Sequence, residues 1–547
     1  MTLRFFFLTS LLISSAAFSS QTPSAKLTPV QQQENLQWLT KFYANPHDPA
    51  PMNEALPKYS SETGQIIHPN VALRLKGVQP KDPLLKLAQV KATSPFLRAQ
   101  KWRNKASHAV IEENDMVDAL TKSWIKADDV VWDLDSIPTT GQSTISLWSD
   151  DYWRTEWGGA SYRYASQVQY DNYKKAIAAY DQPSEWTMAD VNLDSDQLAS
   201  KIIDWSPAEK YDLSVGDWSF ALTNEQKDEG KKSMDSDGNV ADWVGICEGW
   251  SAASIMVPRP TKSVTVVGAD SVPIKWYPSD VRAMASLAWA RGNTDVNFIS
   301  GRCDAQTPDE YPNGRLKQQE CFDTNPATFH LALGNLIGRS QQSFVMDVAF
   351  DYEVWNQPVK SYEMTYFNPL DPSKTSKDWK TVAVDYDDRF INRDRFQDPL
   401  TRGVRNGSDY DDSAIKKIVG VTTTVVYMSE ADPPDHTPNS SDEFYAMTTY
   451  QYDLELTEKD GKLIPTGGEW FQNAHPDFLW VPNKDTVAHT DADQVALSYD
   501  GKQVPSKKVT NTAGEGSLEG YPLCQVLSKL VDGSSGKSYA CDEKKKR

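Results

Sequence analysis

The strongest hydrophobic pattern in the chain lies between residues 242 and 260. Apolar side chains recur there at the spacing of one buried helix face: Ile246, Trp250, Ala253 and Val257. Pro258 follows directly, and proline ends a helix. The pattern predicts a short helix with Cys247 in its first turn, on the side it shares with Ser251 and Ser254.

A thiol in the first turn of a helix is chemically favoured as a nucleophile. The partial positive charge and unpaired N–H groups of a helix N-terminus stabilise a thiolate, and they leave a donor for an oxyanion. Cys247 is therefore a candidate nucleophile that we expect to be partly ionised near neutral pH. The alternative is a small core thiol, because free cysteine is often buried.

Other patterns predict a mixture of helices and strands. Ser206, Pro207 and Glu209 form the start of a helix, with a side-chain cap, a proline at the first position and an acid at the third. Two strands and a helix follow the cysteine: Ser263–Val267, Val272–Trp276 and Pro278–Arg291. Further strands are predicted at Ile415–Met428 and Phe444–Leu456, with a hairpin turn at Asp460-Gly461.

A second pattern offers a base for the thiol. Large apolar and small residues alternate from Phe329 to Gly334, and apolar residues alternate again from Ser343 to Ala349, which predicts two strands. In a hairpin that turns at Gly338-Arg339, His330 faces Asp347 with Cβ atoms about 4.5–5.5 Å apart. Asp347 would orient the imidazole, which would accept the thiol proton. The alternative for His330 is a structural histidine.

Composition divides the chain into five segments. They are 1–19, a signal peptide; 20–115, an arm or prosegment; 116–400, a catalytic core; 401–484, a β-rich region packed on the core; and 485–547, a polar tail. The signal peptide is indicated by Arg4, an apolar run to Phe18 and a small-residue cleavage site, so we expect a secreted or periplasmic protein. No later stretch is apolar for the roughly 20 residues that a membrane span needs.

Charge and cysteine content narrow the function. The net charge of −19 repels nucleic acid and makes it an unlikely partner. Of five cysteines, Cys303 with Cys321 and Cys524 with Cys541 are close enough in loop-like sequence to form disulfides in an oxidising compartment. Cys247 is left over, which favours a chemical role for its thiol.

An acidic segment before the thiol could bind a cation. Asp235, Asp237 and Asn239 alternate around a glycine and could converge oxygen atoms on Ca²⁺. The spacing lacks the full 12-residue loop and closing glutamate of an EF-hand, so a plain acidic turn is the alternative.

The peptide Val354–Val359, with the sequence Val-Trp-Asn-Gln-Pro-Val, gives the chain a family resemblance. It is the hallmark peptide of the elicitor-type transglutaminases of oomycetes and marine bacteria, which this chain closely resembles. Matching motifs extend over about 60% of the chain: Trp148–Trp153 with Gly158-Gly159, Ser206–Asp212, Gly245–Trp250, His330, Gly467–Trp470 and His475–Trp480.

The resemblance implies an α+β enzyme whose core is distantly related to papain-like peptidases. It implies a calcium-dependent protein-glutamine γ-glutamyltransferase that forms a thioester on Cys247 and passes it to a lysine or another primary amine. Cys247 and His330 carry over directly, and Asp347 rests partly on the hairpin register. Glu248 departs from the histidine expected there in many relatives, and an acid facing the sulfur would oppose thiolate formation.

Several details stay open at this level. We expect Trp243, Trp250 and Trp355 to frame the thiol, and the side-chain oxyanion donor is Trp243, Asn239 or Gln357. The hallmark peptide is either a wall of the site or an exposed recognition loop. Two other functions are possible: a cysteine peptidase or amidase that uses the same three residues with water as acceptor, and a catalytically silent secreted protein that is recognised through Val354–Val359.

Overall fold

The structure is a computed structural model of the chain. It describes residues 58–60, 66–67, 124–166, 172–180, 202–268, 271–292, 294–300, 324–349, 353–386, 415–431, 443–468, 475–488, 499–511 and 523–540, together with residues 33, 37, 170, 197, 199–200 and 470. The predicted signal peptide, nearly all of the arm, and Cys303, Cys321 and Cys541 lie outside these residues, so export and both disulfides stay predictions. Cys247 is a free thiol among the described cysteines.

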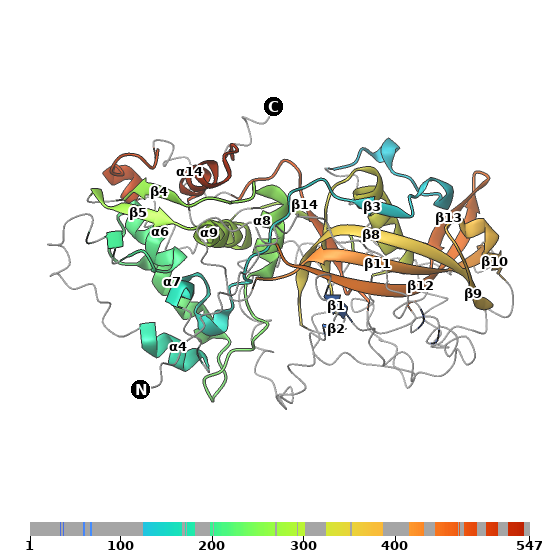
Figure 1. Cartoon of the computed structure of the whole chain (residues 1–547), viewed down its shortest axis with the longest axis horizontal. Coiled ribbons are helices and arrows are strands. Elements are labelled where there is room, and N and C mark those ends of the chain that lie inside the picture. The colour runs from blue at the N-terminus through green and yellow to red at the C-terminus, as the bar shows by residue number, and fades with distance from the viewer. Residues whose placement is uncertain are drawn as a thin grey trace, which may run out of the picture.

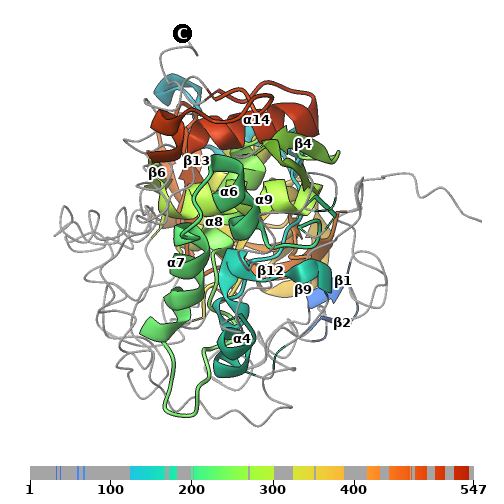
Figure 2. The ribbon, with the colours of Figure 1, turned by 90° about the vertical axis from the view of Figure 1, so that its left-hand side faces the viewer.

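The described residues form a helical part and a sheet part, which meet at one buried helix (Figure 1). The α-helices are α4 (Tyr173–Tyr180), α6 (Pro207–Val215), α7 (Ala221–Glu229), α8 (Cys247–Met256), α9 (Pro278–Arg291), α10 (Pro326–Ala332) and α14 (Cys524–Ser535). Viewed from the helical side, α14, α9 and α8 lie in front of the sheet (Figure 2). Helix α8 packs on α9 and also on the sheet, so it is the element that joins the two parts.

Twelve strands of the described chain form one sheet, whose main path runs β2-β1-β12-β11-β8-β7-β14-β6. The path strands are β1 (Lys58–Ser60), β2 (Ile66–Ile67), β6 (Val296–Phe298), β7 (Val345–Asp347), β8 (Asn356–Asn368), β11 (Ile415–Met428), β12 (Tyr445–Lys459) and β14 (Leu479–Pro482). Side branches are β3 (Thr140–Gln142), β9 (Asp371–Ser376), β10 (Val384–Asp385) and β13 (Lys462–Gly467). Strands β4 (Val264–Val267) and β5 (Pro273–Trp276) form a separate hairpin.

Most elements predicted from the local pattern are confirmed. Helix α8 begins at Cys247 and α9 has the predicted bounds. Helix α6 begins with the predicted capping box at Ser206. Asp460 and Gly461 both have positive φ in the turn between β12 and β13, as the hairpin requires.

The predicted hairpin of His330 and Asp347 is wrong. The Asn325 side chain accepts the N–H of Ala327, and Pro326 occupies the first position, so a helix, α10, begins there and continues as a π-helix over Leu333–Arg339. Every residue of α10 is buried. A helix buried on all sides has no polar face, and its sequence can therefore imitate the alternation of a strand.

The β-rich region also differs from its expected form. Strand β11 pairs with β8 from Gly420–Phe367 to Tyr427–Val359, so these strands continue the sheet of the predicted core and do not form a second sheet packed on it. No helix among the described residues has the length and apolar character to cross a membrane.

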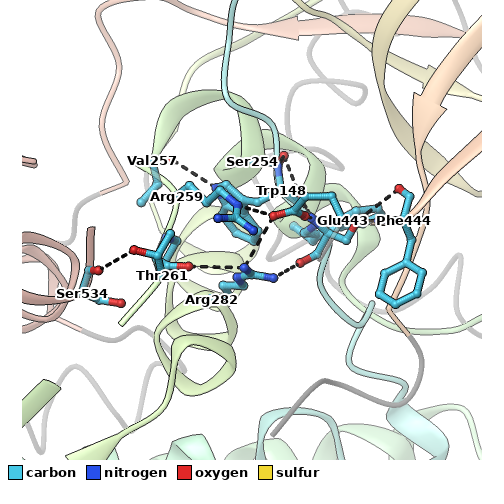
Figure 3. A network of polar contacts seen from close by, with 12 residues as sticks. Trp148, Ser254, Val257, Arg259, Thr261, Arg282, Glu443, Phe444 and Ser534 are labelled. Carbon is cyan, nitrogen blue, oxygen red and sulfur yellow. Dashed lines mark hydrogen bonds and ion pairs between the residues drawn. The ribbon is translucent and has the colours of Figure 1, made fainter. Parts of the chain in front are cut away.

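A polar network fastens α8 to its surroundings (Figure 3). Glu443, just before β12, accepts hydrogen bonds from the Ser149 N–H and from Arg259 Nε. Arg282 of α9 donates to the carbonyl oxygens of Ser149 at 2.5 Å and Pro260 at 3.3 Å. The loop that leaves α8 is therefore held by groups from both parts of the molecule.

A second buried polar group stabilises the helical part. Lys210 Nζ of α6 lies 2.6 Å from Asp280 Oδ2 of α9, and both side chains are almost fully buried. Tyr164 donates to Asp280 Oδ1 at 2.9 Å, and the Tyr277 N–H donates to Oδ2 at 2.7 Å. The ion pair thus has the additional hydrogen bonds that a buried pair needs.

Candidate active site

Cys247 is held at the start of α8 by a close backbone contact. The N–H of Ile246 donates to the Tyr152 carbonyl at 2.7 Å. At Gly245 any Cβ would lie 2.3 Å from that same Tyr152 oxygen, so only glycine fits. The Gly-Ile-Cys sequence therefore fixes where the helix begins relative to the Tyr152 segment.

Two residues of the hallmark peptide contact the sulfur. Cys247 Sγ lies 3.5 Å from the carbonyl oxygen of Val354 and 3.5 Å from Nδ2 of Asn356. The Asn356 amide is oriented by Trp480, whose Nε1 donates to Oδ1 at 2.7 Å. The hallmark peptide therefore forms a wall beside the thiol, which was one of the two interpretations left open by the sequence, and not an exposed recognition loop.

Some of the aromatic residues around the thiol line the site, and others belong to the hydrophobic core. The half-buried Trp355 ring packs edge-on against Tyr152, with centroids 5.5 Å apart. Trp250 is fully buried and donates to the Trp148 carbonyl at 3.1 Å, which is the position of a core residue. Trp243 is partly buried and packs on the same core.

The predicted partial ionisation of the thiol is wrong. Burial raises the pKa of Cys247 well above its usual range, and the negative charge of Glu248 raises it further, against a smaller opposing effect of the Asn356 amide. Glu430 also raises this pKa. The acid at position 248 thus acts on the thiol pKa in the direction expected, although burial has the larger effect.

The charge of an acidic residue, Glu430, acts on the thiol. Gln357 donates through Nε2 to Glu430 Oε1. The charge of Glu430 acts on Asp151 as well as on Cys247. Burial raises the pKa values of Asp150 and Asp151 to about 7 each, even though Arg282 and Arg154 respectively lower them. These carboxylates were not predicted from the sequence as site residues.

Asp347 positions the hallmark peptide. Its Oδ1 accepts the N–H of Ala349 at 3.0 Å and the N–H of Trp355 at 2.9 Å. On the sheet Asp347 pairs with Asn356, the residue that contacts the sulfur. The buried carboxylate therefore stabilises the turn into β8, and it faces Asn356 across the ladder where the prediction had placed His330.

His330 lies in a different environment. Its ring is fully buried, with Nδ1 3.0 Å from the Tyr452 hydroxyl and Nε2 3.4 Å from the Tyr366 hydroxyl. Burial lowers the pKa of His330 to about 3, so the imidazole is neutral. This environment is that of the structural histidine weighed as the alternative.

The positions along β8 separate His330 from the thiol. Asn356, at the sulfur, and Tyr366, at the imidazole, are ten positions apart on this strand. At about 3.3 Å per residue their Cα atoms are roughly 33 Å apart, far more than side chains can bridge. Among the described residues, the structure does not bring His330 and Cys247 together.

We expect His330→Gln to weaken the fold and to leave the chemistry intact. The tyrosine hydroxyls lose well-placed partners, which costs roughly 1–3 kcal/mol. Activity per folded molecule should stay within about threefold of the wild type. The stability of the variant should also depend less on acid. In the wild type, the lowered pKa of His330 stabilises the native state above about pH 6.5, and this stabilisation is lost as the pH falls towards about 3. The variant has no histidine here and therefore lacks this dependence.

The measurements are urea unfolding across this pH range and the pH profile of activity. Tyr452→Phe is the matched control, because it removes one hydroxyl from the same imidazole. A folded His330→Gln protein that has lost activity at all pH values would show instead that His330 is the base predicted from the sequence.

The acidic segment before α8 forms a turn. Asp235 Oδ1 accepts the N–H of Asp237 at 2.9 Å and of Asn239 at 2.8 Å, and Asn239 Nδ2 lies 3.2 Å from Asp235 Oδ2. The carboxylate thus faces N–H donors, as in the plain acidic turn, and this arrangement does not present converging oxygens to a cation. A calcium requirement stays a prediction that the geometry of this turn does not support.

Local patterns did not identify Asn356, Trp480 and Glu430 as site residues. Asn356 lies in the hallmark peptide and Trp480 in another matched motif, so the resemblance contained a signal for both. Glu430 had no such signal. It follows β11, which pairs with β8 as far as Tyr427 and Val359, and its charge acts on the thiol.

The fold and site define a mixed helix–sheet protein with a free thiol enclosed by the hallmark peptide. The model of the family described as transglutaminase elicitor matches residues 124–388 and 407–509. This is more than half of the chain, and the chain therefore belongs to the transglutaminase elicitor family, as the resemblance indicated.

The chain is also similar to a solved structure. The GP42 transglutaminase from Phytophthora sojae is similar at 21% sequence identity, with a TM-score of 0.45; the match covers 77% of this chain and 97% of that chain. No curated protein matches.

Proposed function

We propose that this protein is a protein-glutamine γ-glutamyltransferase in which Cys247 carries the acyl group. The observation that supports this most is the contact of the hallmark peptide with the one free thiol of the described chain, through Val354 and Asn356. Membership of the transglutaminase elicitor family supports the same class of reaction.

The reaction has two steps. Sγ attacks the carboxamide carbon of a protein glutamine, a C–S bond forms, the C–N bond breaks, and ammonia leaves with the thiol proton. A primary amine then attacks the thioester, so that a new C–N bond forms and the C–S bond breaks. Lysine side chains and small primary amines are the acceptors of this proposal.

Two groups can stabilise the oxyanion of each step. The first N–H groups of α8 point towards the sulfur end of the helix and have no partners within the helix. Asn356 supplies a side-chain N–H, and Trp480 fixes its orientation. Donors fixed before the reaction are the main source of such stabilisation. Asn356 thus takes the role for which the sequence suggested Trp243, Asn239 or Gln357.

The nature of the acceptor decides between the candidate functions. The mature protein is mixed with a glutamine-rich protein and a fluorescent primary amine, and both incorporated label and released ammonia are measured. We expect label and ammonia in equal amounts. Ammonia or peptide cleavage without label would indicate a thiol hydrolase, and no thiol-dependent product would indicate a recognition protein.

A further inference from the structure

One peptide group of the hallmark peptide is hydrogen-bonded at both of its ends. The carbonyl oxygen of Val354 accepts the hydrogen bond of the Cys247 thiol, with Sγ 3.5 Å away. The N–H of Trp355 belongs to the same peptide group and donates to Asp347 Oδ1 at 2.9 Å. A peptide group is planar and rigid, so a residue that fixes its N–H also fixes the direction of its carbonyl oxygen. Asp347 is thus connected to the thiol through one rigid group.

Asp347 is itself held in place. Its Oδ1 also accepts the N–H of Ala349, two residues further on, at 3.0 Å, which is the hydrogen bond of an Asx turn. Its backbone N–H donates to the Phe478 carbonyl at 3.0 Å, and the residue is fully buried in β7. The carboxyl group is therefore a fixed point from which the Val354–Trp355 peptide group is held.

The residues that follow this peptide group are held by the same strand. The N–H of Val348 donates to the Trp355 carbonyl at 3.1 Å. Asn356 pairs with Asp347 on the ladder, and residues directly opposite each other point to the same face of a sheet. On that face Nδ2 of Asn356 donates to Cys247 Sγ. The sulfur thus gives one hydrogen bond and accepts another, and these two contacts define how it is oriented.

We propose that Asp347 is a positioning residue for acyl transfer, which holds the Val354–Trp355 peptide group so that the thiol hydrogen points to the Val354 oxygen. A sulfur lone pair is then left on the side of the Asn356 amide, the donor that stabilises the oxyanion in the proposed reaction. This inference rests on the proposed function. Asp347 acts here through the backbone, whereas the sequence suggested that it orients an imidazole.

The test removes the acceptor oxygen and then restores it. Asp347→Ala has no acceptor for the Trp355 N–H, whereas Asp347→Asn keeps an oxygen that can accept it. For Asp347→Ala we expect the kcat of amine incorporation to fall about 10- to 100-fold, because a misplaced nucleophile loses rate, with the KM for the glutamine donor little changed. Asp347→Asn should stay within about threefold of the wild type. Asp347→Val, which suits a strand, is a second variant without an acceptor if the alanine variant does not fold.

Infrared spectroscopy follows the thiol contact directly and needs no transfer reaction. The S–H stretching band of Cys247 is the band that is lost in Cys247→Ser, and hydrogen bonding lowers its frequency. We expect this band to move to higher frequency in Asp347→Ala and Asp347→Val and to stay in place in Asp347→Asn. A band that moves in neither the alanine nor the valine variant would overturn the inference.

Asp212→Ala is the matched control. Asp212 is also fully buried and accepts two backbone N–H groups, those of Leu222 at 3.3 Å and Thr223 at 3.0 Å, but it does so in the helical part. This variant should lose stability and keep both the kcat per folded molecule and the S–H band. If Asp347→Ala behaved in the same way, Asp347 would have a structural role only. If Asp347→Asn lost as much kcat as Asp347→Ala, the negative charge would matter more than position, which also overturns the inference.

Failure of the proposed function can be told apart from failure of this inference. Wild-type protein that neither incorporates an amine nor releases ammonia would contradict the proposed function. The infrared comparison of the Asp347 variants would still decide whether Asp347 directs the thiol.

Discussion

Replacing Cys247 by serine is expected to reduce amine incorporation by roughly 10⁴-fold or more. The hydroxyl is a much weaker nucleophile than the thiol, and the site contains no described imidazole that contacts position 247 and could activate it. The fold should be nearly unchanged, since the two side chains differ by one atom. Incorporation of a fluorescent amine and mass spectrometry of the trapped acyl-enzyme measure the effect.

Ser251→Ala is the matched control on the same helix. Its hydroxyl donates to the Glu248 carbonyl one turn earlier, at 3.1 Å, and does not contact the sulfur. This variant should retain activity within a few-fold of the wild type. If Cys247→Ser were as active as Ser251→Ala, the thiol would not be the nucleophile.

The second large effect concerns stability. Lys210→Met is expected to destabilise the protein by about 3–5 kcal/mol, because it leaves the buried Asp280 carboxylate without its cation. The loss should appear as a lower urea midpoint of the transition that reports on the helical part. The double variant Lys210→Met with Asp280→Asn should be more stable than the single variant, since it removes the uncompensated charge.

An exposed ion pair gives the comparison. Lys231 lies within bonding distance of Asp228 on the surface, with about half of each side chain exposed. Lys231→Met should change stability by less than about 1 kcal/mol. If Lys210→Met destabilised the protein by as little as this, water or a rearrangement of Tyr164 would be compensating the charge left on Asp280.

Local chemistry made the helices around the thiol predictable. Proline at the first turn, a capping hydroxyl at Ser206 and the apolar spacing after Cys247 each act within a few residues of their position. The strands with β-branched alternation, such as β11, were predictable for the same reason. The position of the free thiol at the start of α8 could therefore be predicted from the sequence.

Which residues lie next to each other in space was harder to predict than which segments form helices and strands. The proposed base depended on one register between two short segments, and both of its assumptions failed: the first segment is a buried helix, and β7 pairs with β8 and β14. The prediction that the thiol is partly ionised failed for a related reason. The helix N-terminus is visible in the sequence, whereas the burial of Cys247 and the effect of the Glu430 charge are properties of the assembled fold.

The way in which the sheet is assembled also determines when the site can exist. The Cys247 environment includes Asn356 from β8, Glu430 from the segment after β11, and Trp480 from β14, the last strand of the described residues. During synthesis the thiol therefore leaves the ribosome long before its enclosing residues. The proposed acyl-transfer site forms only after position 480 has been added, so nascent chains that stop earlier carry the cysteine without the surroundings that the proposed reaction needs.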